Sequence, residues 1–440
     1  MKQTYVLIQC IVLFSLGTTG FAQSGLDPSS TGSPTRRYSI EEATSLALRN
    51  NPEIKAAVRR VSLAETKTLT AGSLDDPMFM YRDWGTPLKQ PWDLNQAQHM
   101  LALQQTFPGP GKRLARFRIG KDDVEVERAQ LESLKQDISA RVRKSFVDLL
   151  RNVDEMRLHD KQAALLHDAT DTATSKYTVG KVPQADVLRA QILLTKLADH
   201  LIQLDQDRDL ARAELNTLMG IDPATHIDVV GAYRPVTVLP SIVELEQTAL
   251  VHRPELGGLR TQVKAGEDQM HLARLAYKPD YTVAMGYMLN PPGSMARNDY
   301  MAEFTISLPW LNRRKHDDEI KQADVATEVS RTDLEARRAT VFLEVETALV
   351  KVRSAQKSMK LYRDTLTPQA EATFQAALVA YQNDRTDFLS LIDSENMLLD
   401  VETSVFKASA EADARLADLE RAIGAPVTAK SQLADDREDK

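Results

Sequence analysis

Apolar side chains recur every three or four positions along most of the chain, which is the spacing of one face of an α-helix. Residues 112–177 contain no proline and a single glycine, Gly120. The pattern there predicts a helix of about 65 residues, roughly 100 Å long at 1.5 Å per residue. After a turn at residues 179–183, heptad spacing continues to about residue 219 with one polar position, Arg208. We therefore predict a long helical hairpin over residues 112–219.

A second helical hairpin is predicted over residues 312–423. Apolar residues keep the heptad spacing on both sides of a break at Asn383 and Asp384. Such heptads are typical of cytoskeletal or tethering coiled coils, and the helices alone favour that interpretation. The segments between the helices change this preference.

Four segments outside the hairpins alternate apolar and polar side chains, as strands with one apolar face do. They are residues 78–84, 98–107, 280–289 and 300–308. Strands of about 10 residues with this alternation are typical of outer-membrane β-barrels, although a small soluble sheet packed on the helices fits the alternation too. Four strands are too few to close a barrel, and open strand edges in lipid leave backbone groups unpaired. A membrane sheet of this size therefore requires several copies of the chain.

The chain also repeats itself at a shift of about 202 positions. Matched positions include Ala47 and Ala249, Leu48 and Leu250, Pro52 and Pro254, Glu53 and Glu255, Val61 and Val263, and Glu65 and Glu267. We therefore predict two structural repeats, residues 38–230 and 231–425. Each contains short helices, then a pair of strands, then a long helical hairpin.

The N-terminus predicts export of the protein. Lys2 precedes an apolar run from Tyr5 to Leu16, and small residues follow as far as Ala22, as in a secretory signal peptide. The run is shorter than the roughly 20 residues that cross a bilayer, which disfavours a membrane anchor. We assign residues 1–22 to a signal peptide, 23–37 to a flexible leader and 426–440 to a disordered tail.

Composition argues against several classes of function. The single cysteine, Cys10, lies in the predicted signal peptide, so the mature chain is predicted to have no disulfide and no cysteine-bound metal. A net charge of −7 without a dense basic tract gives no support for nucleic-acid binding. No GxSxG, P-loop or HExxH motif occurs, so we predict no enzymatic activity and no cofactor.

Several short motifs, taken together, resemble the outer-membrane efflux protein family typified by TolC, and loosely its heavy-metal branch. The resemblance covers the chain from about residue 38 to 424. Its motifs are Asn51-Pro52-Glu53-Ile54, Arg253-Pro254-Glu255-Leu256, Phe107-Pro108-Gly109-Pro110-Gly111, Leu308-Pro309-Trp310, and Tyr177-Thr178-Val179-Gly180 followed by Ala185 to Gln191.

This resemblance implies a mainly α protein with membrane β-strands. Three protomers would form one 12-stranded β-barrel in the outer membrane, continued by a periplasmic α-barrel tunnel of coiled helices. Such a homotrimer works with a periplasmic adaptor (membrane fusion) protein and an inner-membrane efflux pump, and passively conducts what the pump exports. An exported coiled-coil scaffold or adaptor-like protein without a membrane barrel is the alternative.

The resemblance also implies a gate at the periplasmic end. The matching positions are Asp186, Arg189, Ser390 and Asp393. Asp393 is the strongest candidate, because a three-fold ring of carboxylates would narrow the lumen and favour cations. A simpler role for Asp186 and Asp393 is to place negative charge near helix N-termini.

The two hairpin turns are the predicted sites at which the adaptor docks. Their residues are Val179, Gly180, Lys181, Asn383, Asp384 and Arg385. Gly180 suits the left-handed conformation of a helix end, which Asn383 or Asp384 tolerate less well. Ordinary structural turns explain these residues equally well.

Methionines gather in or beside the predicted strands, and thioethers suit Cu(I). They are Met78, Met80, Met285, Met288, Met295 and Met301. Because methionine more often fills gaps or faces lipid, we predict no metal site.

Overall fold

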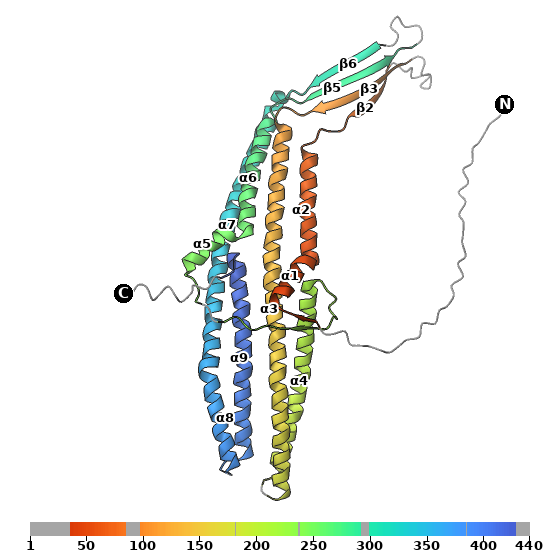
Figure 1. Cartoon of the computed structure of the whole chain (residues 1–440). Helices are drawn as coiled ribbons and strands as arrows, with labels where there is room; N and C mark the ends of the chain where they lie inside the picture. Colours follow the sequence, from red (N-terminus) through yellow and green to blue (C-terminus); the bar gives the residue numbers. More distant parts are fainter. Residues whose placement is uncertain are drawn as a thin grey trace, which may run out of the picture.

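The computed structural model describes residues 36–84, 97–180, 182–235, 238–291, 299–383 and 385–427. The molecule is long, with a small sheet at one end and two helical hairpins at the other (Figure 1). The predicted signal peptide, most of the predicted leader and tail, Met295, Lys181 and Asp384 lie outside the described residues.

The first repeat contains four helices and three strands, and a fourth short strand follows its hairpin. Arg36 and Arg37, predicted as leader, belong to a strand that pairs in parallel with residues 227–229. The elements are β1 (Arg36–Tyr38), α1 (Ile40–Asn50), α2 (Pro52–Ala71), β2 (Met78–Trp84), β3 (Gln98–Phe107), α3 (Lys112–Thr178), α4 (Gln184–Met219) and β4 (Ile227–Val229).

The second repeat has the same order, with one irregularity in its long helix. Its elements are α5 (Ile242–His252), α6 (Pro254–Leu275), β5 (Tyr281–Leu289), β6 (Asp299–Ile306), a 3₁₀ turn η2 (Pro309–Asn312), α7 (Arg313–Leu361), a π-helical turn η3 (Tyr362–Leu366), α8 (Thr367–Gln382) and α9 (Phe388–Ile423). Within the described ranges, no helix combines the length and the apolar character needed to cross a membrane.

Equivalent positions of the two repeats begin and end their helices in the same way. The N-cap side chains of Ser39 and Ser241 each accept a hydrogen bond from the backbone N–H of a glutamate three residues later. The carboxylate of that glutamate accepts a hydrogen bond from the backbone N–H of the N-cap serine. Gly220 and Gly424, at φ +68° and +74°, end α4 and α9 in the left-handed conformation. A Cβ atom on either glycine would lie under 3 Å from the carbonyl oxygen of the helix packed against it. Both helix ends therefore require glycine.

The strands and the upper helices form one continuous wall. The sheet order is β2-β3-β5-β6, and every neighbouring pair is antiparallel. The helices attached to these strands pack in the same order, α2 on α3, α3 on α6 and α6 on α7. Below this wall, α3 packs on α4 and α9, while α9 also packs on α7 and α8. The first repeat thus contributes β2, β3, α2 and α3 to the wall, and the second contributes β5, β6, α6 and α7 (Figure 1).

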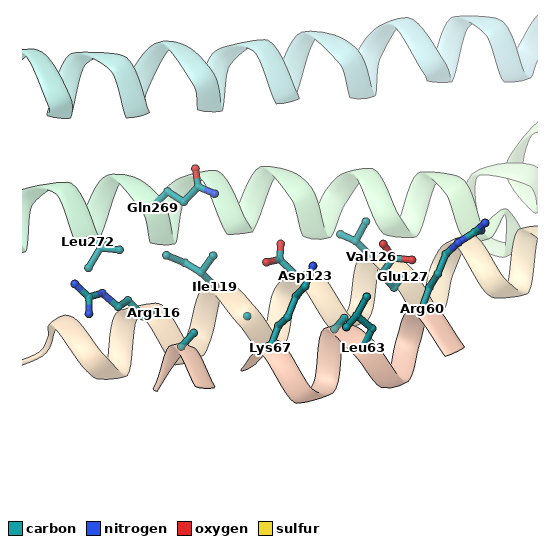
Figure 2. A pocket seen from close by; sticks show the side chains of 13 residues that line it. Arg60, Leu63, Lys67, Arg116, Ile119, Asp123, Val126, Glu127, Gln269 and Leu272 are labelled. Atoms are coloured by element: carbon teal, nitrogen blue, oxygen red, sulfur yellow. The ribbon is translucent and has the colours of Figure 1, made fainter. Parts of the chain in front are cut away.

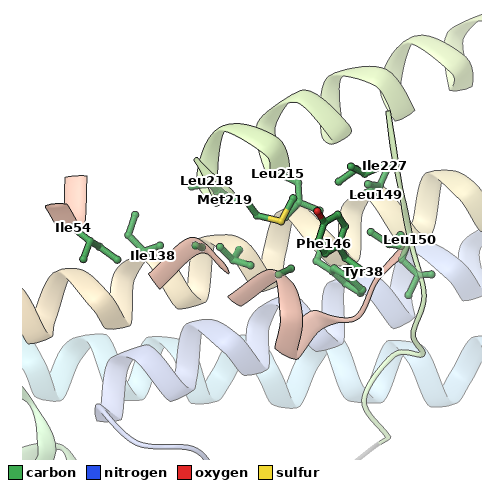
Figure 3. Packing of buried hydrophobic residues seen from close by; sticks show 14 residues of the cluster. Tyr38, Ile54, Ile138, Phe146, Leu149, Leu150, Leu215, Leu218, Met219 and Ile227 are labelled. Carbon is green, nitrogen blue, oxygen red and sulfur yellow. The ribbon is translucent and has the colours of Figure 1, made fainter. Parts of the chain in front are cut away.

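Each repeat has its own apolar core at mid-length, which we call the waist of the molecule. In the first repeat, α1, α3, α4 and β4 enclose Ile138, Phe146, Leu215 and Met219 (Figure 3). A separate core in the second repeat is built from α5, α6, α7 and α9. These cores fix the short helices and strands of the waist against the long hairpins.

A charged network joins the two repeats at the waist. The Asp413 carboxylate on α9, fully buried, lies 2.7 Å from Nη2 of Arg143 on α3 and 2.7 Å from Nε of Arg234. Burial alone would raise the pKa of this carboxyl, but the hydrogen bond from Arg143 and the charge of Arg234 outweigh it and lower the pKa. A buried ion pair of this kind prevents α3 and α9 from sliding along each other, because breaking it leaves an uncompensated buried charge.

Candidate functional site at the hairpin tips

The two hairpin turns lie together at the end of the molecule farthest from the sheet (Figure 1). One apolar cluster connects all four helices there, with Leu166 from α3, Val187 and Ala190 from α4, Tyr381 from α8 and Phe388 from α9. The tips are therefore one packed unit, although they come from different repeats.

The first turn exposes backbone at its apex. Gly180 has φ +73°, and its N–H donates to the carbonyl of Tyr177 at 2.9 Å. Nothing lies within 4 Å of the position a Cβ atom would occupy there. Val179 beside it is well exposed. This part of the turn is free to contact another molecule.

The second turn uses a different geometry. Asn383 has φ −94°, so the left-handed conformation considered for it is not adopted. Its side-chain amide donates to the Val379 carbonyl at 2.7 Å, and the Arg385 N–H donates to Ala380 at 2.9 Å. These bonds satisfy the last carbonyls of α8 without a glycine.

Three of the four gate candidates form two local pairs, one on each hairpin. Asp186, whose side chain is only 13% exposed, lies 3.9 Å from Nη1 of Arg189 one turn later on α4. Ser390 donates its hydroxyl and its N–H to the carboxylate of Asp387, the N-cap of α9, at 2.5 and 3.0 Å. These bonds lower the pKa of Asp387, and the charge of Arg189 adds to this effect. Arg189 of the first hairpin therefore lies near enough to Asp387 of the second for its charge to act on that carboxylate.

Asp393, the fourth candidate, stands apart from these pairs. It is exposed on α9, and no described residue forms a hydrogen bond or ion pair with it. Its exposed side chain is therefore available to act on a neighbouring protomer or on an ion.

The architecture and the tips can now be compared with known proteins. A family model described as "Outer membrane efflux protein" matches residues 43–221 and again 245–425. The chain belongs to the outer membrane efflux protein family. The match spans both repeats, and each half of it begins within α1 or α5 and ends after α4 or α9.

Relatives in this family cover most of the chain. The chain is 23% identical over 363 residues to the cobalt-zinc-cadmium resistance protein CzcC of Cupriavidus metallidurans, covering 82% of this chain and 83% of that protein. It is 19% identical to Nodulation protein T of Rhizobium leguminosarum bv. trifolii, covering 84% and 80%.

Solved structures of similar fold are outer-membrane channels. The outer-membrane channel OprN superposes with a TM-score of 0.73 at 17% identity, covering 88% of this chain and 89% of that one. CusC gives 0.74 at 15% identity over 88% and 92%, and the CmeC channel of Campylobacter jejuni gives 0.73 at 12% identity over 90% and 88%.

Membership in the outer membrane efflux protein family confirms the main predictions from the sequence. The fold is mainly helical with membrane strands, the protein belongs to the outer membrane with a large periplasmic part, and its function is that of an efflux channel. The alternative of an exported scaffold without membrane strands is not supported.

Two acidic residues at the tips of this efflux protein were not singled out from the sequence. Asp387 has a readable signal, since an acid followed three residues later by serine is typical of a helix N-cap. Glu395 lies four residues after Leu391 and three before Leu398, where the heptad spacing predicts an apolar residue. Its Oε1 is buried without a hydrogen-bond partner among the described residues. Burial raises its pKa to about 7.

One groove lies in the wall, far from the tips. It has a volume of about 670 Å³ between α2, α3 and α6 (Figure 2). Lys67 and Arg116 carry positive charge on it, Asp123 carries negative charge, and Leu272 is apolar. In the described part of the chain, no three histidine, cysteine or acidic side chains gather as a metal site would require.

Proposed function

We propose that three copies of the chain close into one tube, which passively conducts solutes delivered by an inner-membrane pump through a periplasmic adaptor (membrane fusion) protein. The observation that supports closure is that strands and helices form a single wall with two open sides. The sheet ends at β2 and at β6, so each copy offers two unpaired strand edges. In lipid these edges must pair with another copy.

The open sides of the helical wall support the same assembly. The edge helices α2 and α7 carry large apolar side chains that the protomer leaves exposed. They are Val58, Leu63 and Leu69 on α2, and Val325, Val329 and Leu343 on α7. Because large exposed apolar patches mark interaction surfaces, contact between α7 of one protomer and α2 of the next would bury them.

The sheet has one face suited to lipid. Phe79, Tyr300 and Phe304 lie on it and are 71%, 88% and 64% exposed. Lipid-facing residues of outer-membrane strands are apolar, with aromatic residues near the interfaces. The opposite face would then line the lumen.

The tips are the proposed gate. Three copies of Asp393 would form a carboxylate ring that favours cations, and the Asp186, Arg189 and Asp387 group with Ser390 would hold neighbouring hairpins together. The exposed apex at Val179 and Gly180, together with Lys181 in the first turn and Asn383, Asp384 and Arg385 in the second, is the proposed adaptor surface. A tube with these parts carries out no bond chemistry, so we propose no enzymatic activity, no cofactor and no nucleic-acid partner.

Conductance in a planar lipid bilayer tests the tube and its gate together. We would compare the wild type with Asp393→Ala and with Asp400→Ala, an exposed acid seven residues later on the same face of α9. A trimer is expected by native mass spectrometry. Asp393→Ala should raise conductance or reduce cation selectivity several-fold more than Asp400→Ala. A monomer without conductance would overturn the tube, and equal effects of the two variants would overturn the gate.

A further inference from the structure

Methionines are concentrated on one face of the sheet. Of the 13 methionines in the chain, six lie in β2, β3, β5 and β6. In an antiparallel sheet, paired residues share a face, and the face alternates along each strand. The strand register places five of the six on the face opposite Phe79 and Phe304, namely Met78, Met80, Met100, Met288 and Met301. Met285 faces the other way.

Four of these methionines are consecutive neighbours across the sheet, in the order Met80, Met100, Met288 and Met301. One row across the sheet runs Met80, Ala102, Gly286, Met301, and the next row runs Arg82, Met100, Met288, Asp299. The methionines therefore stand at the ends of one row and in the middle of the next. Diagonal neighbours of this kind are roughly 7–8 Å apart at Cα, within reach of long side chains.

The floor beneath them is built of very small residues. Ala102 and Ala284 are each 2% exposed. A Cβ atom on Gly286 would lie 2.6 Å from the Leu101 carbonyl oxygen and 2.7 Å from the Ala102 Cβ, so this face is crowded at its base. Long, flexible side chains on both sides of a small floor can turn their sulfur atoms inward.

The chemistry of this face differs from that of an ordinary lumen wall. Lumen-facing residues of outer-membrane barrels are polar, and an apolar side chain there has no lipid to contact. Leucine would cover the small floor as well as methionine does, but only methionine offers a soft sulfur donor. Asp299 and Glu303 lie on the same face and add negative charge, while the Arg82 guanidinium contacts the Met80 Sδ at 3.6 Å.

We infer that Met80, Met100, Met288 and Met301 form a reversible site for a soft monovalent cation such as Cu(I) or Ag(I) passing through the tube. Such a cation is cargo, so binding must be loose enough to permit release. The assignment of this face to the lumen rests on the proposed function. The prediction of no metal site from the sequence treated these methionines singly, whereas the register groups them.

Silver binding followed by NMR tests this inference directly. Full-length protein with the Cys10→Ser change, which removes the only competing thiol, would carry ¹³C-labelled methionine methyl groups in detergent micelles. We would titrate it with silver nitrate and, separately, with magnesium nitrate. Silver is expected to shift the methyl signals of the four methionines and to leave Met285 unchanged. Magnesium, a hard cation, should shift none.

Two variants provide the matched comparison. Replacing all four methionines by leucine, in M80L/M100L/M288L/M301L, keeps the apolar volume nearly constant and should reduce silver affinity at least tenfold. Met285→Leu, on the same strand but the other face, should keep wild-type affinity. The inference is overturned if the variant with four substitutions binds silver like the wild type, or if all methyl signals shift in parallel.

Conductance of the same preparation separates this inference from the proposed function. A conducting trimer without silver-dependent shifts would remove the cation site and leave the tube intact. Silver-dependent shifts in a protein that does not conduct would keep the site and overturn its place in a lumen.

Discussion

Two buried carboxylates on α9 respond to burial in opposite ways. Asp413 is held by Arg143 and Arg234, and the pKa of its carboxyl is lowered. Glu395, near the tip, has a buried oxygen without a partner among the described residues, and its pKa is raised to about 7. The waist is therefore stable with its carboxylate charged, whereas the tip is most stable with its carboxyl neutral.

Glu395→Gln should remove a pH dependence from the tip. Because the folded protein binds this proton more tightly than the unfolded chain, the associated stability is present below about pH 4.5 and is lost as pH rises to about 7. The change amounts to roughly 1–3 kcal/mol. Hydrogen exchange over the start of α9, measured from pH 5 to 8, should show protection that falls in the wild type and stays level in the variant. Asp400→Asn, an exposed acid on the same helix, serves as control, and an unchanged slope in Glu395→Gln would contradict the prediction.

At the scale of single residues, the sequence predicts which residues lie near the tips better than it predicts which groups surround them. Spacing after the hairpin turns identifies Asp186 and Asp393 as acids near the tips. It does not reveal that Arg189 approaches Asp387 of the other hairpin, because that distance depends on how two repeats pack. Nor can it reveal that the Glu395 Oε1 has no hydrogen-bond partner among the described residues, since such partners come from elsewhere in the fold.

At the scale of helices, two close contacts depend on glycine. A Cβ atom on Gly266 of α6 would lie 2.9 Å from the Thr327 Oγ1 of α7, and one on Gly120 of α3 would lie 2.9 Å from the Thr68 Oγ1 of α2. Both pairs thus approach through a Gly and Thr contact, with the glycine on the long helix α3 in the first repeat and on the shorter helix α6 in the second. Helical spacing alone records these glycines only as weak helix formers.

Gly266→Leu should destabilise the wall, because the added side chain forces α6 and α7 apart at a cost of about 1–3 kcal/mol. Gly257→Leu, in the same helix, gains helix propensity and meets no atom within 4 Å at Cβ. Thermal unfolding of the purified protein would compare the two. The expected result is a lower midpoint for Gly266→Leu and an unchanged or higher one for Gly257→Leu; equal midpoints would show that the close contact is unimportant.

The elements themselves were largely predictable, apart from the short pair β1 and β4 and one irregularity in the second hairpin. Alternation identifies the four strands, and heptads identify the hairpins. The π-helical turn at residues 362–366 has no heptad signal. Pro368, just after this turn, has no N–H to donate to the Asp364 carbonyl. The Tyr362 carbonyl accepts from both the N–H and the hydroxyl of Thr367, five residues later, with the hydroxyl at 2.9 Å.

For the whole molecule, the decisive contacts cross between the repeats. β3 pairs with β5, and α3 packs on both α6 and α9. Periodicity within a segment cannot select a partner in the other half of the chain, so the order of the wall was not predicted from the sequence. The duplication explains why that order is regular, since each repeat supplies two neighbouring strands and their helices.

The described ends of the chain lie beside each other at the waist. One groove is lined by Ile40 and Glu41 from the beginning and by Gly424, Ala425 and Pro426 from the end, and the Gln136 side chain donates to the Gly424 carbonyl at 3.2 Å. The wall, the sheet and the tips all lie away from this point (Figure 1).

A circular permutant should therefore assemble like the natural chain. Val427 would be joined to Arg36 by a short linker at the waist, and the new ends would open between β4 and α5, where the first repeat passes to the second. Native mass spectrometry and bilayer conductance should match the wild type, while a monomeric product would contradict the expectation. Wild-type assembly by the permutant would mean that the chain can begin at either of the two places where one repeat meets the other.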